Sequence, residues 1–464
     1  MNFNWFNIEI SALSLLPSLI AIVLALYSRN VILSLFGGIV LGVLVLNDFT
    51  LASSVESLLL LFTSLLSKSW ILKTLAFAVL VGSIMALIEK SGGIESFVDF
   101  MQHRVALVKS PRSALMLSYF VGVLIFVESS ITALIAGAVG KPLCNKYRIP
   151  SAKLAFVCDS TSAPISSIIV LNGWGALLLG LISTQITLGV IHADAINLLI
   201  ESILYNFYAM SALLVTFIAI WFNIDIGAMK SAKYMPTQAE SIKGNGVSMF
   251  YMLAPILLMV AFVFLFLYIT GNGNILKGSG SSSIFYTMLA TLVFTLFYFV
   301  GTKNMTLSLW SETAFRGAVK LVPIALVLLF AFGIGEITTQ LKTGEYLASL
   351  ASESLSIYLL AGVIYLLSSL IAFSTGTSWG TFSIMIPVAV PMAVSMDADV
   401  ALCIGAVISG GIFGDHCSPI SDTTIISSLA SDCEVIQHVK TQLPYALISG
   451  VVTFILYIIF SLYG

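Results

Sequence analysis

Charged residues are scarce in this sequence. Only 9% of its 464 residues are Asp, Glu, Lys or Arg, whereas 59% are hydrophobic, and the formal net charge is −2. A nearly neutral chain gives no indication of a nucleic-acid partner. The scarcity of charge leaves apolar runs longer than about 18 residues, which is the length that spans the hydrocarbon of a bilayer. The composition therefore predicts a polytopic membrane protein in contact with lipid.

Cysteine is also scarce, and other signals are missing altogether. The five cysteines are odd in number and form no C-x-x-C pair, which indicates neither a disulfide framework nor a zinc site. No nucleotide-binding loop of the G-x-x-x-x-G-K-[ST] type is present, which argues against an ATP-driven pump. Nothing supports an enzymatic activity or a bound cofactor. The first apolar run, 11–27, follows no basic segment and precedes no small-residue cleavage site, so it is expected to stay as a helix.

The apolar runs predict an all-α fold of about ten transmembrane helices. They lie near residues 11–28, 31–47, 70–89, 153–190, 197–222, 249–270, 283–301, 321–341, 399–431 and 442–462. If successive crossings alternate in direction, 16 of the 20 basic residues share one face, and Lys68, Lys73, Lys277 and Lys342 lie on the other. The positive-inside rule then makes the basic face cytoplasmic and places both termini outside. Residues 223–248 form the predicted cytoplasmic linker between halves 1–222 and 249–464.

Two shorter interrupted segments predict re-entrant hairpins. In 113–140, an arm of about 14 residues is roughly 21 Å of helix, too short for a hydrocarbon core of about 30 Å. Basic loops flank this segment, so it is expected to enter from the cytoplasm and return there, with Glu128-Ser129-Ser130 at its tip. The segment 357–396 repeats the arrangement between acidic flanks and is expected to enter from outside.

Broken helices and an internal repeat complete the pattern. Gly410, Gly411 and Pro419 interrupt the run 399–431, and Pro164 interrupts 153–190. The sequence 163–166, Ala-Pro-Ile-Ser, matches 418–421, Ser-Pro-Ile-Ser. Because each half has five crossings and one hairpin, the second half is expected to be inverted relative to the first. Inverted repeats with broken helices are typical of secondary transporters.

The hairpin tips and helix breaks are expected to converge on one ion or substrate site. The candidate residues are Glu128, Ser129, Ser130, Thr132, Asp159, Ser160, Thr161, Ser162, Ser374, Thr375, Gly376, Thr377, Asp415, His416, Ser418 and Asp422. Carboxylate, hydroxyl and free carbonyl oxygens are the hard ligands that a small cation prefers, so Asp159 and Asp415 are candidate sodium ligands. Each acid has a structural alternative, as a helix cap or the partner of a basic residue. His416 is equally expected as a proton relay or as a hydrogen-bonded structural histidine.

The stretch 414–424, GDHCSPISDTT, together with TSWGT at 377–381, resembles the NhaC-type sodium/proton antiporter family. The resemblance implies a bacterial inner-membrane transporter of the ion transporter superfamily. Members of that superfamily pair a dimerising scaffold with a mobile transport domain of two hairpins and two broken helices, so it also implies a homodimer. Similar proteins include a malate/lactate exchanger and carriers of amino acids.

Two functions therefore stay open at this point. The first is sodium/proton antiport, because a buried carboxylate can bind either a proton or sodium. The second is sodium-coupled transport or exchange of a small carboxylate or amino acid, because the half-helix N-termini after Pro164 and Pro419 present partial positive charge to an organic anion. A pore-type channel fits poorly with inverted broken helices and closed hairpins.

Overall fold

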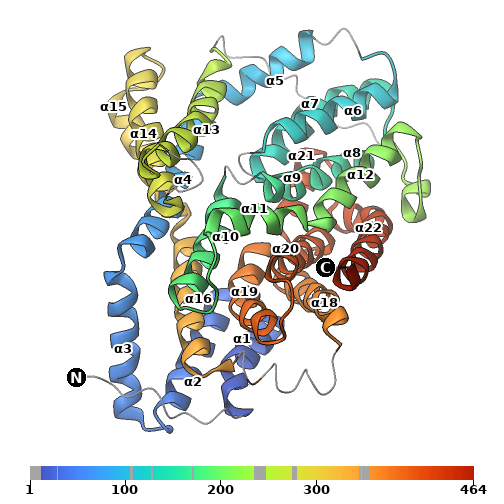
Figure 1. Cartoon of the computed structure of the whole chain (residues 1–464). Coiled ribbons are helices and arrows are strands. Elements are labelled where there is room, and N and C mark those ends of the chain that lie inside the picture. Colours follow the sequence, from blue (N-terminus) through green and yellow to red (C-terminus); the bar gives the residue numbers. More distant parts are fainter. Residues whose placement is uncertain are drawn as a thin grey trace.

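The computed structural model of the chain is built from helices, and no strand occurs in the part of the chain that it describes (Figure 1). The described residues are 12–28, 30–104, 108–126, 129–169, 172–234, 247–273, 279–343, 346 and 356–463. Within these ranges, nine helices are long and apolar enough to cross a membrane, or ten if one bent pair counts as a single span. The predicted all-α membrane fold with about ten spans is confirmed.

One group of helices surrounds α4 and α16. It consists of α1 (Leu16–Ser28), α2 (Val31–Leu46), α3 (Leu51–Ser67), α4 (Ser69–Lys90), α13 (Phe250–Thr270), α14 (Gly280–Gly301), α15 (Leu307–Lys320) and α16 (Val322–Gln340). Helices α4 and α15 cross with almost no space between their backbones, because a Cβ added to Gly82 would lie 2.2 Å from the carbonyl oxygen of Gly317. Helices α3 and α15 were not among the predicted crossings, since their apolar residues alternate with hydroxyl or charged side chains.

A second group gathers around α20. It consists of α6 (Pro111–Leu124), α7 (Ser129–Tyr147), α8 (Ser151–Ser160), α9 (Ala163–Ile168), α10 (Gly173–Thr187), α11 (Ala195–Leu204), α12 (Phe207–Trp221), α18 (Ile357–Thr375), α19 (Ser378–Ser395), α20 (Val400–Cys417), α21 (Asp422–Ala430) and α22 (Val435–Tyr463). In Figure 1 these helices occupy the right-hand part of the molecule, opposite α13 to α15. Helix α5 (Gly93–Arg104) links the two groups, and short 3-10 turns lie at Ala12–Leu15 and Gly227–Ser231.

The interruptions between helices have local causes. Proline removes a backbone donor and its ring clashes with the carbonyl four residues earlier, which favours a helix end ahead of it. Helix α8 ends four residues before Pro164, and α20 ends two residues before Pro419, with Ser418 in the extended conformation that favours a following proline. Helices α19 and α10 begin after N-cap residues, which are Thr377 and Asn172. The breaks are therefore encoded by residues at the breaks themselves.

Helix α20 packs against α18 through small residues. A Cβ added to Gly410 would lie 2.3 Å from the carbonyl oxygen of Tyr365, and one added to Gly414 would lie 2.2 Å from that of Ser369. Only glycine at these positions lets the two backbones approach so closely. This contact places the C-terminal end of α20, with Asp415 and His416, beside the end of α18.

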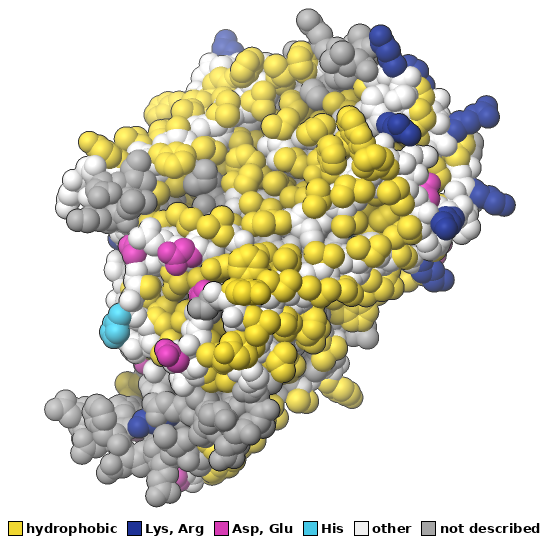
Figure 2. All heavy atoms as spheres, turned by 45° about the vertical axis from the view of Figure 1, so that its right-hand side comes forward, with side chains coloured by type: hydrophobic (Ala, Val, Ile, Leu, Met, Phe, Trp, Pro, Cys, Tyr) yellow, Lys and Arg dark blue, Asp and Glu magenta, His cyan; other side chains and the backbone are white. Residues whose placement is uncertain are grey.

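The surface carries the charge asymmetry that the sequence predicts for a membrane protein. Figure 2 shows a broad apolar face, with most of the visible Lys and Arg side chains gathered along one edge and most of the visible acidic side chains near the opposite edge. An apolar band between two charged edges is the surface expected of a chain that crosses a bilayer. The protein is thus a multi-pass membrane protein.

Candidate functional site

Asp159, the last acidic residue of α8, lies at the centre of a buried polar network. Its Oδ2 atom accepts hydrogen bonds from Nε2 of Gln442 at 2.7 Å and Oγ1 of Thr424 at 3.3 Å, and lies 3.2 Å from Nε2 of His438. The Asp159 side chain is fully buried, and none of the described residues forms a hydrogen bond with its Oδ1 atom. Three helices, α8, α21 and α22, therefore converge on one carboxylate oxygen.

His416, near the end of α20, joins the second break to this network. Its Nε2 atom lies 3.2 Å from Oγ of Ser160 and 3.9 Å from Oδ2 of Asp159, and its Nδ1 atom lies 2.7 Å from the hydroxyl of Tyr208. Gln442 also donates to the His416 carbonyl oxygen at 2.6 Å. The break in the first half of the chain is thus in direct contact with the break in the second half.

Asp415 has a different environment, built from oxygen atoms. Its Oδ2 atom accepts a hydrogen bond of 2.7 Å from the hydroxyl of Ser378, the first residue of α19, and this hydroxyl also lies 3.1 Å from the Gly411 carbonyl oxygen. The Asp415 side chain is 2% exposed, and its Oδ1 atom has no hydrogen-bond partner in the part of the chain that the structure describes. Asp422, which is exposed at the start of α21, is close enough for its charge to act on Asp415.

Each hairpin contacts a helix break. At the second tip Gly376 has a φ of +67°, and a Cβ there would lie 2.8 Å from the Ile420 carbonyl oxygen, while Ser418 donates to the Phe373 carbonyl oxygen at 2.7 Å. In the first hairpin the contact is made by an arm and not by the tip, since a Cβ added to Gly122 of α6 would lie 2.1 Å from Oγ1 of Thr161. The second tip and the two breaks are therefore in contact through named atoms, whereas the convergence of the first tip on the same site stays a prediction.

The remaining candidate residues have more local roles. Thr161 and Ser162 donate to carbonyl oxygens within their own helix turn, and Thr375 donates to Ile371 of α18. Thr377 caps α19. The other candidates lie at the two tips, with Ser374 and Ser130 half-buried, Ser129 buried at the start of α7, and Thr132 bonded to the Ile125 carbonyl oxygen. Glu128 lies outside the described residues.

Four important side chains were not among the predicted site residues. His438 and Gln442 lie one turn apart in α22, Tyr208 lies in α12, and Ser378 begins α19. Tyr208, His438 and Gln442 lie inside helices that have no break beside them, so no helix break marks them. Ser378 lies between Gly376 and Gly380 at the predicted second tip, but it was not included among the site residues. The i, i+4 spacing of His438 and Gln442, which places both on one face of an otherwise apolar helix, is the signal that could have indicated the pair.

The comparisons with known proteins agree on a transporter. The profile of the "Na+/H+ antiporter family" matches residues 172–462. An uncharacterised protein of Haemophilus influenzae is 30% identical over 99% of this chain and 93% of its own length. A "Malate-2H(+)/Na(+)-lactate antiporter" of Bacillus subtilis is 36% identical over 110 residues, which is 24% of this chain and 23% of that protein.

Among solved structures, the chain is similar to Neisseria gonorrhoeae MtrF, whose structure is described as illuminating a class of antimetabolite efflux pumps. The TM-score is 0.62 at 15% identity, and the match covers 88% of this chain and 84% of that one. At this identity the likeness shows the fold alone, which is that of a membrane transporter. It supports the helical arrangement in Figure 1 and says nothing of the solute.

Proposed function

Because the chain belongs to the Na+/H+ antiporter family, we propose that this secondary transporter, which is not an enzyme, exchanges sodium ions for protons by alternating access. No cofactor is needed in this scheme, since the two ions are the cargo. The proposal extends to a homodimer in the bacterial inner membrane, with both termini outside and two inverted halves, 1–222 and 249–464. The basic edge in Figure 2 supports a cytoplasmic location for that side under the positive-inside rule.

The observation that carries the proposal is the environment of Asp415. This carboxylate is buried and accepts a hydrogen bond from Ser378, with Ser421 as a further hydroxyl neighbour, and its Oδ1 atom has no hydrogen-bond partner among the described residues. An unsatisfied buried polar atom is costly, by about 1–3 kcal/mol, and by more if it is charged, so it marks a place where a bound ion or proton stabilises the site. The nearby Ser378 hydroxyl and Gly411 carbonyl oxygen are further hard ligands for sodium.

Asp159 is less suited to hold sodium as its main ligand. Its Oδ1 atom also lacks a hydrogen-bond partner among the described residues, but its Oδ2 atom already accepts from Gln442 and Thr424 and faces His438. A carboxylate surrounded by donors of this kind keeps its negative charge stabilised without a metal ion. We therefore assign Asp415 as the primary sodium ligand and Asp159 as a residue that supports sodium affinity from the adjacent break.

The second candidate is sodium-coupled transport or exchange of a small carboxylate or amino acid. It is favoured by the same site, because hydroxyl groups and helix starts of α19 and α21 surround the Asp415 region. The local similarity to a malate/lactate antiporter supports it as well. In this scheme sodium at Asp415 would provide the positive charge beside which an organic anion binds.

Reconstitution distinguishes the two candidates. Purified protein in proteoliposomes would be exposed to an outward or inward sodium gradient while internal pH is followed with a trapped dye. Sodium-driven pH change without any organic solute supports antiport, whereas a pH or sodium signal that requires an added carboxylate or amino acid supports the second candidate. No sodium-dependent signal under either condition would refute both.

A further inference from the structure

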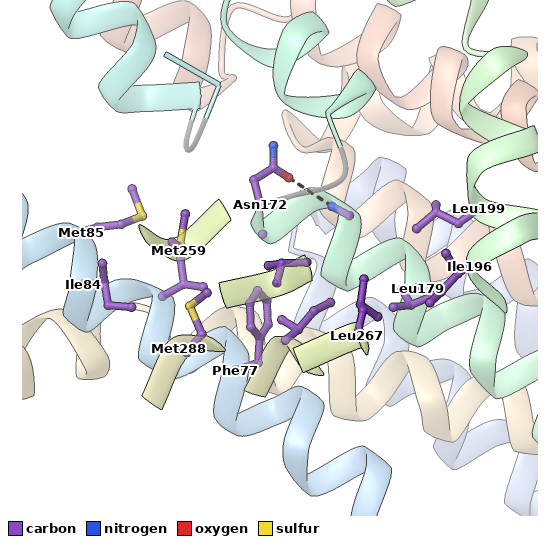
Figure 3. A pocket seen from close by; sticks show the side chains of 15 residues that line it. Phe77, Ile84, Met85, Asn172, Leu179, Ile196, Leu199, Met259, Leu267 and Met288 are labelled. Carbon is purple, nitrogen blue, oxygen red and sulfur yellow. Dashed lines mark hydrogen bonds between the residues drawn. The ribbon is translucent and has the colours of Figure 1, made fainter. Parts of the chain in front are cut away.

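An apolar cavity lies beside the first helix break, outside the polar network described above. It has a volume of about 70 Å³ and lies between α4, α10, α11, α13 and α14 (Figure 3). Its walls are side chains such as Phe77 and Ile84 of α4, Leu179 of α10 and Leu199 of α11. Figure 3 shows these side chains spread along the pocket, from Ile84 on the left to Leu199 on the right, with Asn172 near the upper end. None of the described residues that line the cavity is charged.

The cavity is bounded by flexible side chains. Met85, Met259 and Met288 come from three different helices and face the same space. Methionine has an unbranched, polarisable side chain that adapts to ligands of different shape, and it is common on surfaces that accept several ligands. Three such residues around one space favour a binding site that accepts related hydrocarbon groups over a packing defect in a structural core.

The polar end of the cavity is tied to the hairpin and the break. Asn172 donates from Nδ2 to the carbonyl oxygens of Phe126 at 2.9 Å and Ser166 at 2.7 Å, and its Oδ1 caps α10. The amide therefore holds the end of α6, the short helix α9 and the start of α10 in one arrangement. A movement of the first hairpin tip would change this end of the cavity directly.

Trp379 connects the cavity to the Asp415 site. A Cβ added to Gly173, which lines the cavity, would lie 3.1 Å from Cη2 of Trp379, and the Trp379 and Trp174 rings are 5.9 Å apart. The neighbour of Trp379, Ser378, donates to Asp415. The Trp379 ring thus borders the apolar space, and the residue that precedes it in the chain donates to the candidate ion site.

We propose that this cavity receives the aliphatic side chain of a small carboxylate, with a branched chain of the size found in valine or leucine, whose polar end faces Trp379 and the Asp415 site. The volume of the cavity sets the size of the side chain that it can receive. It is about half that of the roughly 150 Å³ apolar cavity that holds benzene, so it has room for about three or four carbon atoms. The proposal rests on the sodium-coupled transport proposed above and names the class of its organic solute. An α-amino acid and a 2-oxo acid share this chemistry.

The first test is ligand binding to the full-length protein in detergent, followed by the fluorescence of its tryptophans. The probes are L-leucine, L-valine and 4-methyl-2-oxopentanoate, with L-alanine and lactate as short-chain comparators. Because each buried methylene contributes about 0.8 kcal/mol, the branched probes should bind at least about tenfold more tightly than their comparators. The amino acid and the oxo acid identify which head group is accepted. Equal affinity for long and short chains would overturn the proposal.

Two variants of α13 form a matched pair. Val263→Phe fills the cavity from a side chain that is 6% exposed, whereas Leu265→Phe adds the same ring at a position that is 47% exposed on the outer face of the helix. The first should weaken leucine binding at least about tenfold and leave lactate unchanged, and the second should change neither. Met288→Ala enlarges the cavity and should shift the preference from valine towards leucine. A change of size preference cannot result from partial unfolding.

Two outcomes separate this inference from the proposed function. If sodium-driven pH changes occur but no branched carboxylate binds, the cavity proposal fails alone. If leucine or its oxo acid binds as expected but no sodium-dependent flux occurs, the proposed function fails and the binding site stands. A third outcome is that phospholipid co-purifies with the wild type and is lost in Val263→Phe, while all solute affinities stay unchanged. That result would show that an acyl chain fills the cavity, and it would overturn the proposal.

Discussion

His416 and Asp159 belong to helix breaks in opposite halves of the chain, and Nε2 of the imidazole lies 3.9 Å from Oδ2 of the carboxylate. A movement that separates the two breaks would have to break this contact and the Ser160 contact at the same ring nitrogen. The polar network therefore couples the two candidate acids mechanically as well as electrostatically. The predictions below test its parts separately.

Asp415→Asn is expected to abolish sodium-dependent flux. The amide keeps the shape of the side chain and its bond from Ser378, but it loses the negative charge and the titratable proton. The measurement is flux at several sodium concentrations in proteoliposomes with equal amounts of protein. Asp48→Asn, at an exposed turn with a φ of 49°, is the control and should transport normally. Wild-type flux and sodium dependence in Asp415→Asn would contradict its role as a ligand.

Asp159→Asn is expected to weaken sodium affinity while leaving measurable turnover. The hydroxyl of Ser160 remains at the break, and the Asp415 oxygens are unaltered. The amide keeps one acceptor oxygen for Gln442 and Thr424, but it loses the negative charge that these donors stabilise. A higher sodium concentration for half-maximal flux, with a maximal rate above background, is the expected result. Complete loss of flux at saturating sodium would instead assign the primary site to Asp159.

Gln442→Leu is expected to destabilise the fold. The variant removes the donor to the His416 carbonyl oxygen and the 2.7 Å hydrogen bond to Oδ2 of Asp159, which keeps only the 3.3 Å bond from Thr424 and the contact with His438. Leaving a buried acceptor unsatisfied costs about 1–3 kcal/mol. Equilibrium unfolding in mixed micelles measures the loss. Gln437→Leu, in the same helix and half-buried, removes an equal side chain outside the network and should have a small effect. Equal stability of the two variants would show that the network contributes little.

Gly414→Ala is expected to cost about 1–3 kcal/mol of stability by overpacking, because the new methyl group would lie 2.2 Å from the Ser369 carbonyl oxygen. Gly301→Ala is the control, since a Cβ at that position has no neighbour within 4 Å. Melting temperatures in detergent report the difference. A Gly414→Ala protein as stable as the control would mean that α20 and α18 separate easily.

Single cysteines test the predicted inversion of the two halves. A cysteine at Ser130 should react with a membrane-impermeant reagent from the cytoplasmic side, and one at Thr377 from outside. Both positions are half-buried, and all five native cysteines are buried, so background labelling should be low. Labelling of both positions from the same side, with sodium present or absent, would count against inverted repeats.

The sequence allowed the breaks to be predicted, and with them Asp159, Ser160 and His416, because proline, glycine and a mid-helix acid are local signals. His438 and Gln442 could not be found in this way, since α22 is a continuous helix and their partner lies in α8. Contacts between residues this far apart depend on how helices pack, which hydropathy does not record. The apolar cavity could not be predicted for the same reason. Its walls come from five helices, and each lining residue is of a type found in any apolar core.

The glycine contacts between α20 and α18 also restrict how the protein can move. Side chains that interdigitate can shift by exchanging rotamers, but two backbones in contact at Gly410 and Gly414 have no side chains to rearrange. Sliding of α20 along α18 would drive the next bulky residues, Ile412 and Phe413, into the space that the glycines leave free. The two helices must therefore travel as one rigid body, carrying Asp415 with them, and any hinge for alternating access has to lie outside this pair.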